Sequence, residues 1–241
     1  MSRRDWHYYR ARQRARGRER GAEPASAREA VEVLLGERLG FRGFPAALEV
    51  EAGRAADAAE RDGTRRRDLT DLPAFTVDPA TARDFDDAVS AQREEDGWRL
   101  WIHIADVAAH VRPGTPLDLE ARRRANSTYV PGAVEPMLPR ALSEDACSLA
   151  PGVERLAVTA EIELSPSGPR AASFYRSRIR SRARLDYDRL DRVFAGREAA
   201  PEDVAEPLAA GREAAAALGE RRGATSLDVE SAEPEFRFDA A

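Results

Sequence analysis

The chain has 241 residues, of which 42% are hydrophobic and 34% charged, with a net charge of −5. This balance predicts a globular protein with one large domain or two small ones. No apolar run approaches the roughly 18 residues of a membrane helix, and none follows the basic N-terminus as in a secretory signal. The single cysteine excludes an internal disulfide. Together these features predict a cytoplasmic protein that needs no membrane.

The first quarter of the chain is predicted to contain two segments before the main domain. Residues 1–25 are rich in arginine and carry aromatic rings, which could attract phosphates and stack on bases. A disordered, solvated tail is the simpler prediction for them. Residues 26–67 form a small helical region with predicted helices at 26–39 and 45–60. A charged linker then leads into the second domain, which is predicted to span 68–241.

In the second domain the pattern changes from helices to strands and loops. The predicted elements are a strand at 75–77, a hairpin of 88–93 and 98–106, a helix at 117–126, a strand at 156–164 that turns at 165–168 into another, and a helix at 202–221 that Pro207 breaks or kinks. Hairpins mixed with helices predict an α+β fold of antiparallel strands with packed helices, rather than a doubly wound sheet.

Four aspartates lie within ten residues, in the pattern D-x5-D-x-D-D. They are Asp78, Asp84, Asp86 and Asp87. Crowded carboxylates repel one another, and a divalent cation removes that cost. Oxygen ligands select Mg²⁺, Mn²⁺ or Ca²⁺ rather than Zn²⁺. An EF-hand is excluded because no glycine stands at the sixth position counted from Asp84. A solvated acidic loop is the other alternative, which Phe85 inside the cluster argues against.

The aspartate run is the first of five ordered segments that resemble the ribonuclease II/R family, whose catalytic domain is called RNB. The segments are 71–88, 101–118, 127–139, 142–152 and 177–185. The resemblance implies a processive 3′→5′ exoribonuclease that degrades single-stranded RNA to nucleoside 5′-monophosphates and needs Mg²⁺, with Mn²⁺ as an alternative. It also implies that the four aspartates are the metal-binding and catalytic residues.

Other residues are predicted to bind the RNA. Tyr129 resembles the family's aromatic clamp, which stacks on the last base; a buried strand tyrosine is the alternative. Phe236 is placed as the opposing clamp residue. The arginines that alternate along one predicted strand are Arg176, Arg178, Arg180, Arg182 and Arg184. Such a face requires either an RNA strand or acidic partners within the fold, and the sequence favours neither.

The resemblance also indicates what this sequence lacks. The second half of the RNB domain is absent, as are the nucleic-acid-binding modules that usually flank it, so the chain is predicted to be C-terminally truncated. We expect the missing half to come from a separate chain or to have been lost, and residues 1–241 alone to be inactive or very weak. The competing predictions are an RNA-binding fragment that does not cut and a protein-interaction module that uses the N-terminal helices.

Overall fold

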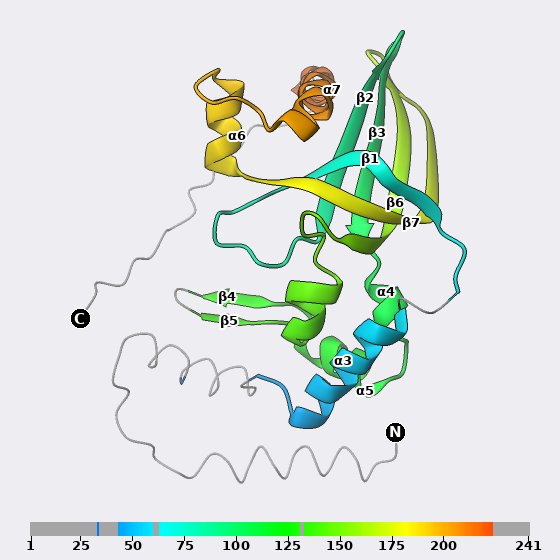
Figure 1. Ribbon diagram of the computed structural model, residues 1–241, viewed down its shortest axis with the longest axis vertical. Helices are drawn as coiled ribbons and strands as arrows, with labels where there is room; N and C mark the ends of the chain where they lie inside the picture. Colours follow the sequence, from blue (N-terminus) through cyan, green and yellow to red (C-terminus); the bar gives the residue numbers. More distant parts are fainter. Residues whose placement is uncertain (1–32, 34–42, 60–62, 131–132, 224–241) are drawn as a thin grey trace, which may run out of the picture.

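The centre of the molecule is a closed barrel of five strands in the order β1-β2-β3-β6-β7 (Figure 1). The computed structural model describes residues 33, 43–59, 63–130 and 133–223. The barrel strands are β1 Arg67–Asp78, β2 Asp87–Glu94, β3 Gly97–Ala105, β6 Glu154–Ser165 and β7 Gly168–Asp186. Closure pairs every barrel strand on both sides, so the barrel itself has no open edge.

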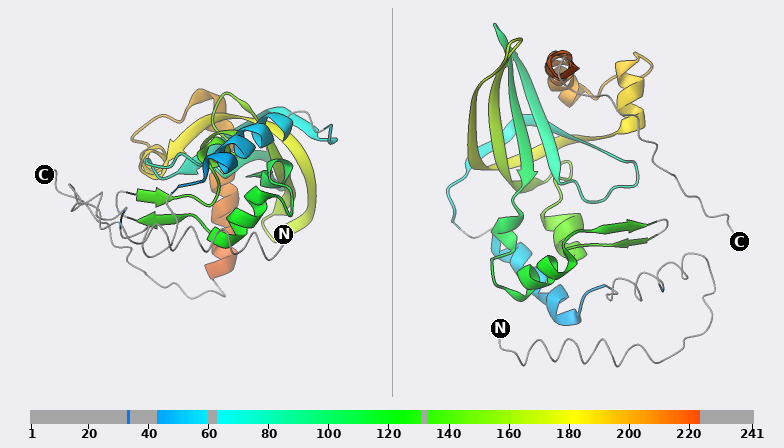
Figure 2. Two further views of the ribbon diagram at one scale, coloured as in Figure 1. Left: turned by 90° about the horizontal axis from the view of Figure 1, so that it is seen from below. Right: turned by 180° about the vertical axis from the view of Figure 1, so that it is seen from behind.

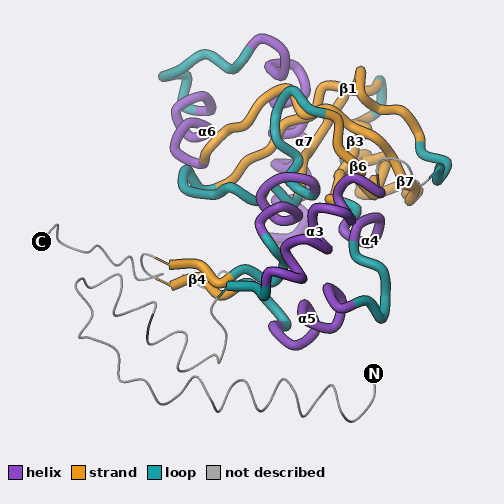
Figure 3. The backbone as a smooth tube through the Cα atoms, turned by 60° about the horizontal axis from the view of Figure 1, so that its bottom comes forward, coloured by secondary structure: helices purple, strands orange, loops and turns teal. Residues whose placement is uncertain are grey.

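Helices and a small hairpin pack around this barrel (Figures 1 and 2). Below it lie α3 Ala46–Ala59, α4 Val107–His110, α5 Pro116–Arg124, the π-helical turn η1 Ala141–Ala146 and the hairpin of β4 Thr128–Val130 with β5 Ala133–Glu135. Beside it lie α6 Tyr187–Phe194, the 3₁₀ turn η2 Glu202–Val204 and α7 Ala205–Gly223. Figure 3 shows α3, α4 and α5 gathered as one group at the lower end. The mixed helix and strand content confirms the predicted α+β class.

The strand directions correct one detail of that prediction. Four neighbouring pairs in the barrel are antiparallel, but β1 and β7 are parallel, with Phe75 opposite Ala183. An odd number of strands that alternate in direction cannot close antiparallel throughout, because the first and last strands point the same way. The parallel pair therefore follows from closing a barrel with five strands.

Most predicted elements are present, with two errors. The helices at 45–60 and 117–126, the hairpin and the two later strands are confirmed within a few residues. The strand predicted at 75–77 is wrong in length, because β1 already begins at Arg67, where its exposed polar residues hide it in the sequence. Pro207 neither breaks nor kinks α7; it lies in the first turn, where a missing N–H removes no helical hydrogen bond.

The middle of the barrel interior holds a buried, hydrogen-bonded polar network. The two ring nitrogens of the fully buried His103 lie 3.2 Å from Ser90 Oγ and 2.8 Å from Thr159 Oγ1, and Thr159 Oγ1 lies 2.6 Å from Ser177 Oγ. The aliphatic face of β3 is the outer one, where Leu100 packs with residues of α7. Because one barrel face must fit inside a narrow closed space, small polar side chains occupy it.

The helical region and the barrel share a hydrophobic core. Leu48 and Ala52 of α3 belong to the same buried cluster as Ala74 of β1 and Ala88 of β2. The domain boundary predicted near residue 68 stays a prediction. The predictions for 1–25, for nearly all of 26–39 and for Phe236 lie outside the described residues. No described helix is long and apolar enough to cross a membrane.

Candidate metal and RNA site

The four predicted aspartates lie on the connection from β1 to β2, called here the aspartate loop (residues 78–87). Asp78 is the last residue of β1 and Asp87 the first of β2, with Asp84 and Asp86 between them. The loop swings out beside the barrel and faces the β4–β5 hairpin (Figures 1 and 2). The barrel thus fixes both ends of the carboxylate cluster.

Hydrogen bonds and a buried ring attach the loop to the body of the protein. Phe85 is buried in the main hydrophobic cluster. The Leu149 N–H donates to the Phe85 carbonyl at 2.8 Å, and the Ala105 N–H donates to the Asp86 carbonyl at 2.9 Å. The prediction that Phe85 ties the acidic run to a buried element is therefore confirmed. A freely solvated acidic loop would not make these contacts.

The four carboxylates lie close enough to affect one another's ionisation. Partial burial raises the pKa of Asp86, and the charges of Asp84, Asp87 and Asp78 raise it further. Partial burial also raises the pKa of Asp78, with contributions in the same direction from Asp87 and Asp84; the Thr76 hydroxyl and Arg184 oppose this shift. The structure thus brings all four predicted residues into one mutually repelling cluster.

This cluster has the donor chemistry of a hard-cation site but not a closed ligand shell. The Asp78 Oδ2 atom is buried and has no hydrogen-bond partner among the described residues, and such an atom is costly unless a cation or donor compensates it. In the described parts of the chain, no three His, Cys, Asp or Glu side chains are already assembled as a metal site. The all-oxygen donor set suits a hard divalent cation such as Mg²⁺, Mn²⁺ or Ca²⁺.

Tyr129 lies directly beside the aspartates. It projects from β4 with 63% of its surface exposed, which excludes a buried strand tyrosine. Its hydroxyl donates a hydrogen bond of 2.7 Å to Asp84 Oδ2, a contact that the sequence did not predict. Partial burial, and then this hydrogen bond, raise the pKa of the phenol to about 12. An exposed ring next to the acidic cluster suits a base-stacking platform.

The five predicted arginines lie on β7, where a register shift between Ser181 and Ala183 interrupts the strict alternation, and each guanidinium group has a contact within the protein. Arg178 and Arg180 both pair with Glu154, at 3.3 and 2.6 Å, and Arg176 lies 3.6 Å from Asp106. Arg182 and Arg184 donate to backbone carbonyls of β1 and of the aspartate loop. The acidic partners named as the alternative to RNA are therefore present for three of the five, and RNA contact by this face stays a prediction.

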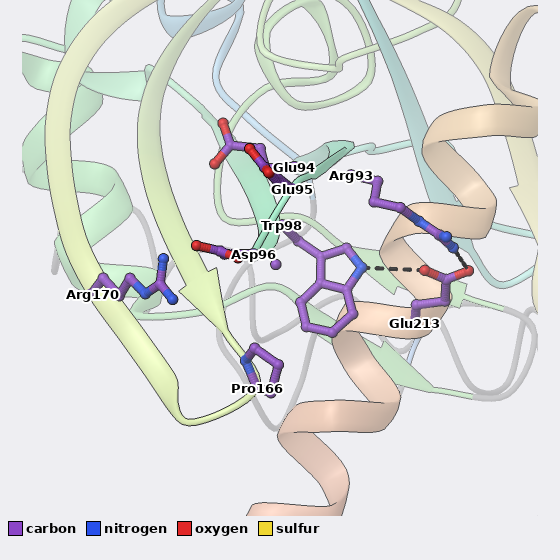
Figure 4. A pocket seen from close by; sticks show the side chains of 9 residues that line it. Arg93, Glu94, Glu95, Asp96, Trp98, Pro166, Arg170 and Glu213 are labelled. Carbon is purple, nitrogen blue, oxygen red and sulfur yellow. Dashed lines mark hydrogen bonds and ion pairs between the residues drawn. The ribbon is translucent and has the colours of Figure 1, made fainter.

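A hollow of about 510 Å³ lies at the other end of the barrel (Figure 4). It is lined by the β2–β3 turn, by Pro166 and Arg170 near the β6–β7 turn, and by Glu213 of α7. The Trp98 indole N–H donates to Glu213, which also pairs with Arg93. The eight residues of β2 place it on the order of 20 Å from Asp87. This hollow contains none of the predicted site residues.

Comparisons with known proteins identify the class to which this fold and site correspond. The RNB domain family matches residues 66–241, and the chain belongs to that family. Ribonuclease R of Escherichia coli K12 is 45% identical over 156 residues, which are 64% of this chain and 19% of the relative. The chain is also similar to the solved structure of Mycoplasma genitalium RNase R with ribose-methylated single-stranded RNA, at a TM-score of 0.72 and 28% identity over 81% of this chain and 31% of that one.

Two facts limit what family membership implies. The chain spans about a fifth of the length of the ribonuclease R relative described above. Yeast Ssd1, described as a pseudonuclease, shares the fold at a TM-score of 0.57 and 22% identity, over 69% of this chain and 20% of that one. The fold therefore occurs with and without nuclease activity, and the function has to be argued from the aspartate loop itself.

Proposed function

We propose that this chain is part of a 3′→5′ exoribonuclease that hydrolyses single-stranded RNA to nucleoside 5′-monophosphates with Mg²⁺ or Mn²⁺. The observation that carries the proposal is the cluster of four carboxylates, in which burial and neighbouring like charges raise the pKa of Asp78 and of Asp86; Asp78 Oδ2 is buried and has no hydrogen bond to any described residue. Ribonuclease R relatives that are 45% identical over the matched region support it. The solved relative with single-stranded RNA supports RNA as the ligand.

Each part of the site has a role in this proposal. Asp78, Asp84, Asp86 and Asp87 would hold the cation. A bound divalent cation promotes ionisation of the attacking water and stabilises negative charge on the attacked phosphodiester. Tyr129 would stack on the terminal base, which contributes roughly 1–3 kcal/mol regardless of base identity. Its hydrogen bond to Asp84 links base binding to the carboxylates.

A second candidate function is an RNA-binding fragment that does not cut. Two observations favour it: the exposed Tyr129 ring can stack without any metal, and the described carboxylates are not assembled into a closed metal shell. The two candidates differ in whether RNA is shortened. Both require RNA binding that weakens as salt increases, because phosphate contacts release counterions.

The test uses a 5′-labelled, unstructured RNA with the whole chain and Mg²⁺. The variants are Asp86→Asn and, as a matched control, Asp188→Asn at an exposed site on α6. Because residues 1–241 alone are expected to be at most weakly active, we expect slow shortening from the 3′ end by the wild-type chain and by Asp188→Asn, and none by Asp86→Asn or with EDTA. Salt-sensitive binding without shortening would favour the RNA-binding fragment. A chain that neither cuts nor binds RNA would contradict both candidates.

A further inference from the structure

Ser148 is a fully buried serine whose hydroxyl is held between two peptide groups of the aspartate loop. It accepts a hydrogen bond of 3.1 Å from the Phe85 N–H and donates one of 3.2 Å to the Arg83 carbonyl. These two groups stand on either side of Asp84 in the chain. A serine hydroxyl has one donor proton, and here that proton is used on the loop.

The support for Ser148 is itself rigid. Its carbonyl accepts a 2.9 Å hydrogen bond from Arg155 Nε, and the same guanidinium group pairs with Asp145 at 2.8 Å. Ser148 also follows directly on Cys147, whose buried side chain belongs to the main hydrophobic cluster. The backbone at Asp84 is thus fixed against the core, whereas its carboxylate remains at the site.

Arg184 holds the other half of the loop. One terminal nitrogen of its guanidinium group lies 3.0, 2.7 and 3.4 Å from the carbonyl oxygens of Pro79, Ala80 and Ala82. The guanidinium carbon lies 4.9 Å from the centre of the Phe85 ring. Arg184 was predicted to contact RNA as part of the arginine face; in the structure one of its terminal nitrogens donates to the loop backbone. Its position on β7 beside β1 brings it there.

We propose that Ser148 and Arg184 are positioning residues that hold the backbone of the aspartate loop where its carboxylates can close on a cation. This inference rests on the proposed function, since it assigns the loop a cation. Four like charges repel one another, so an unanchored loop relaxes by separating them. Two anchors on its two halves keep the carboxylates together before the cation binds. Groups that orient metal ligands typically change metal affinity by 10- to 100-fold when they are removed.

The test measures Mn²⁺ affinity of the whole chain by electron paramagnetic resonance, with thermal unfolding measured alongside. The variants are Ser148→Ala and Arg184→Lys, which keeps the charge but loses the planar fork. Ser90→Ala is the matched control, because Ser90 is equally buried and hydrogen-bonded but faces His103 inside the barrel. We expect the two loop variants to bind Mn²⁺ at least 10-fold more weakly, and Ser90→Ala to stay within twofold of wild type at a similar loss of Tm.

A second measurement separates this inference from the proposed function. Hydrogen exchange of the Phe85 amide in metal-free protein should accelerate in Ser148→Ala and stay slow in Asp86→Asn. Wild-type Mn²⁺ affinity in Ser148→Ala and Arg184→Lys would overturn the positioning role. If the wild-type chain binds no Mn²⁺, the proposed function fails. The anchoring role of Ser148 then depends on the hydrogen exchange of the Phe85 amide alone: faster exchange in Ser148→Ala supports this role, and unchanged exchange overturns it.

Discussion

The barrel interior and the aspartate loop both bring polar groups together, but only the barrel pairs them with one another. Inside the barrel, the His103 ring and the Thr159 hydroxyl are connected by hydrogen bonds from Ser90 to Ser177. In the loop, like charges gather, and Asp78 Oδ2 has no hydrogen-bond partner within the part of the chain that the structure describes. A satisfied network stabilises a fold, whereas an unsatisfied, repelling one lowers stability unless a ligand compensates it. This difference in hydrogen bonding distinguishes residues that stabilise the fold from residues that are placed to bind a ligand.

The largest predicted loss of stability comes from a mutation in the main hydrophobic cluster, which the barrel shares with the helices below it. Ile179 is 1% exposed and packs in the main cluster, so Ile179→Ala should lower the free energy of unfolding by about 2–5 kcal/mol. Ile179→Val, which removes one methylene, should cost only about 0.5–1.5 kcal/mol. Chemical denaturation measures both. Equal losses for the two variants would show that this hydrophobic core is not packed as described.

The second effect is a loss of stability in acid that originates inside the barrel. Burial lowers the pKa of His103 to about 4, so folded protein keeps it neutral while the unfolded chain binds a proton near pH 6.5. Stability is therefore retained above pH 6.5 and falls as the pH drops toward 4, by about 2 kcal/mol at pH 5. Denaturation of wild type and His103→Gln across this range measures it.

His103→Gln is the informative comparison because other groups titrate in the same range. Burial also lowers the pKa of His110, which adds a loss of the same sign in both proteins. The difference between the two pH profiles therefore isolates His103. Parallel profiles for wild type and His103→Gln between pH 6.5 and 4 would contradict a neutral His103 in the folded barrel.

The sequence predicted the local features of this molecule better than its long-range ones. Alternation and an Asp-Gly turn were enough to place the β2–β3 hairpin, and the position of Phe85 was enough to anchor the acidic run. Barrel closure was not predictable, because the parallel β1–β7 pair joins segments about 110 residues apart. For the same reason no local pattern indicated that Ser148, Arg184 and Tyr129 all contact the aspartate loop.

The third predicted effect is a mutation that stabilises the protein, whereas most mutations destabilise it. Asp86 is repelled by three neighbouring carboxylates, so Asp86→Asn should stabilise the metal-free protein, by at most about 1 kcal/mol because the side chain is largely exposed. Millimolar Mg²⁺ should raise the Tm of wild type and not that of Asp86→Asn. Thermal unfolding with EDTA or Mg²⁺ checks this. A less stable Asp86→Asn protein would mean that the carboxylate is structural, like the barrel groups.

The smallest predicted effect concerns the arginine face, whose residues either stabilise the fold or bind RNA. Arg178 shares Glu154 with Arg180 at the surface, so Arg178→Gln should cost less than about 1 kcal/mol of stability. Because the guanidinium group is already paired, we expect the salt dependence of RNA binding to stay unchanged. An RNA phosphate contact would instead reduce the salt slope by about one. A reduced slope would show that Arg178 binds RNA and does not only stabilise the fold, which is one of the two alternatives that the sequence left open.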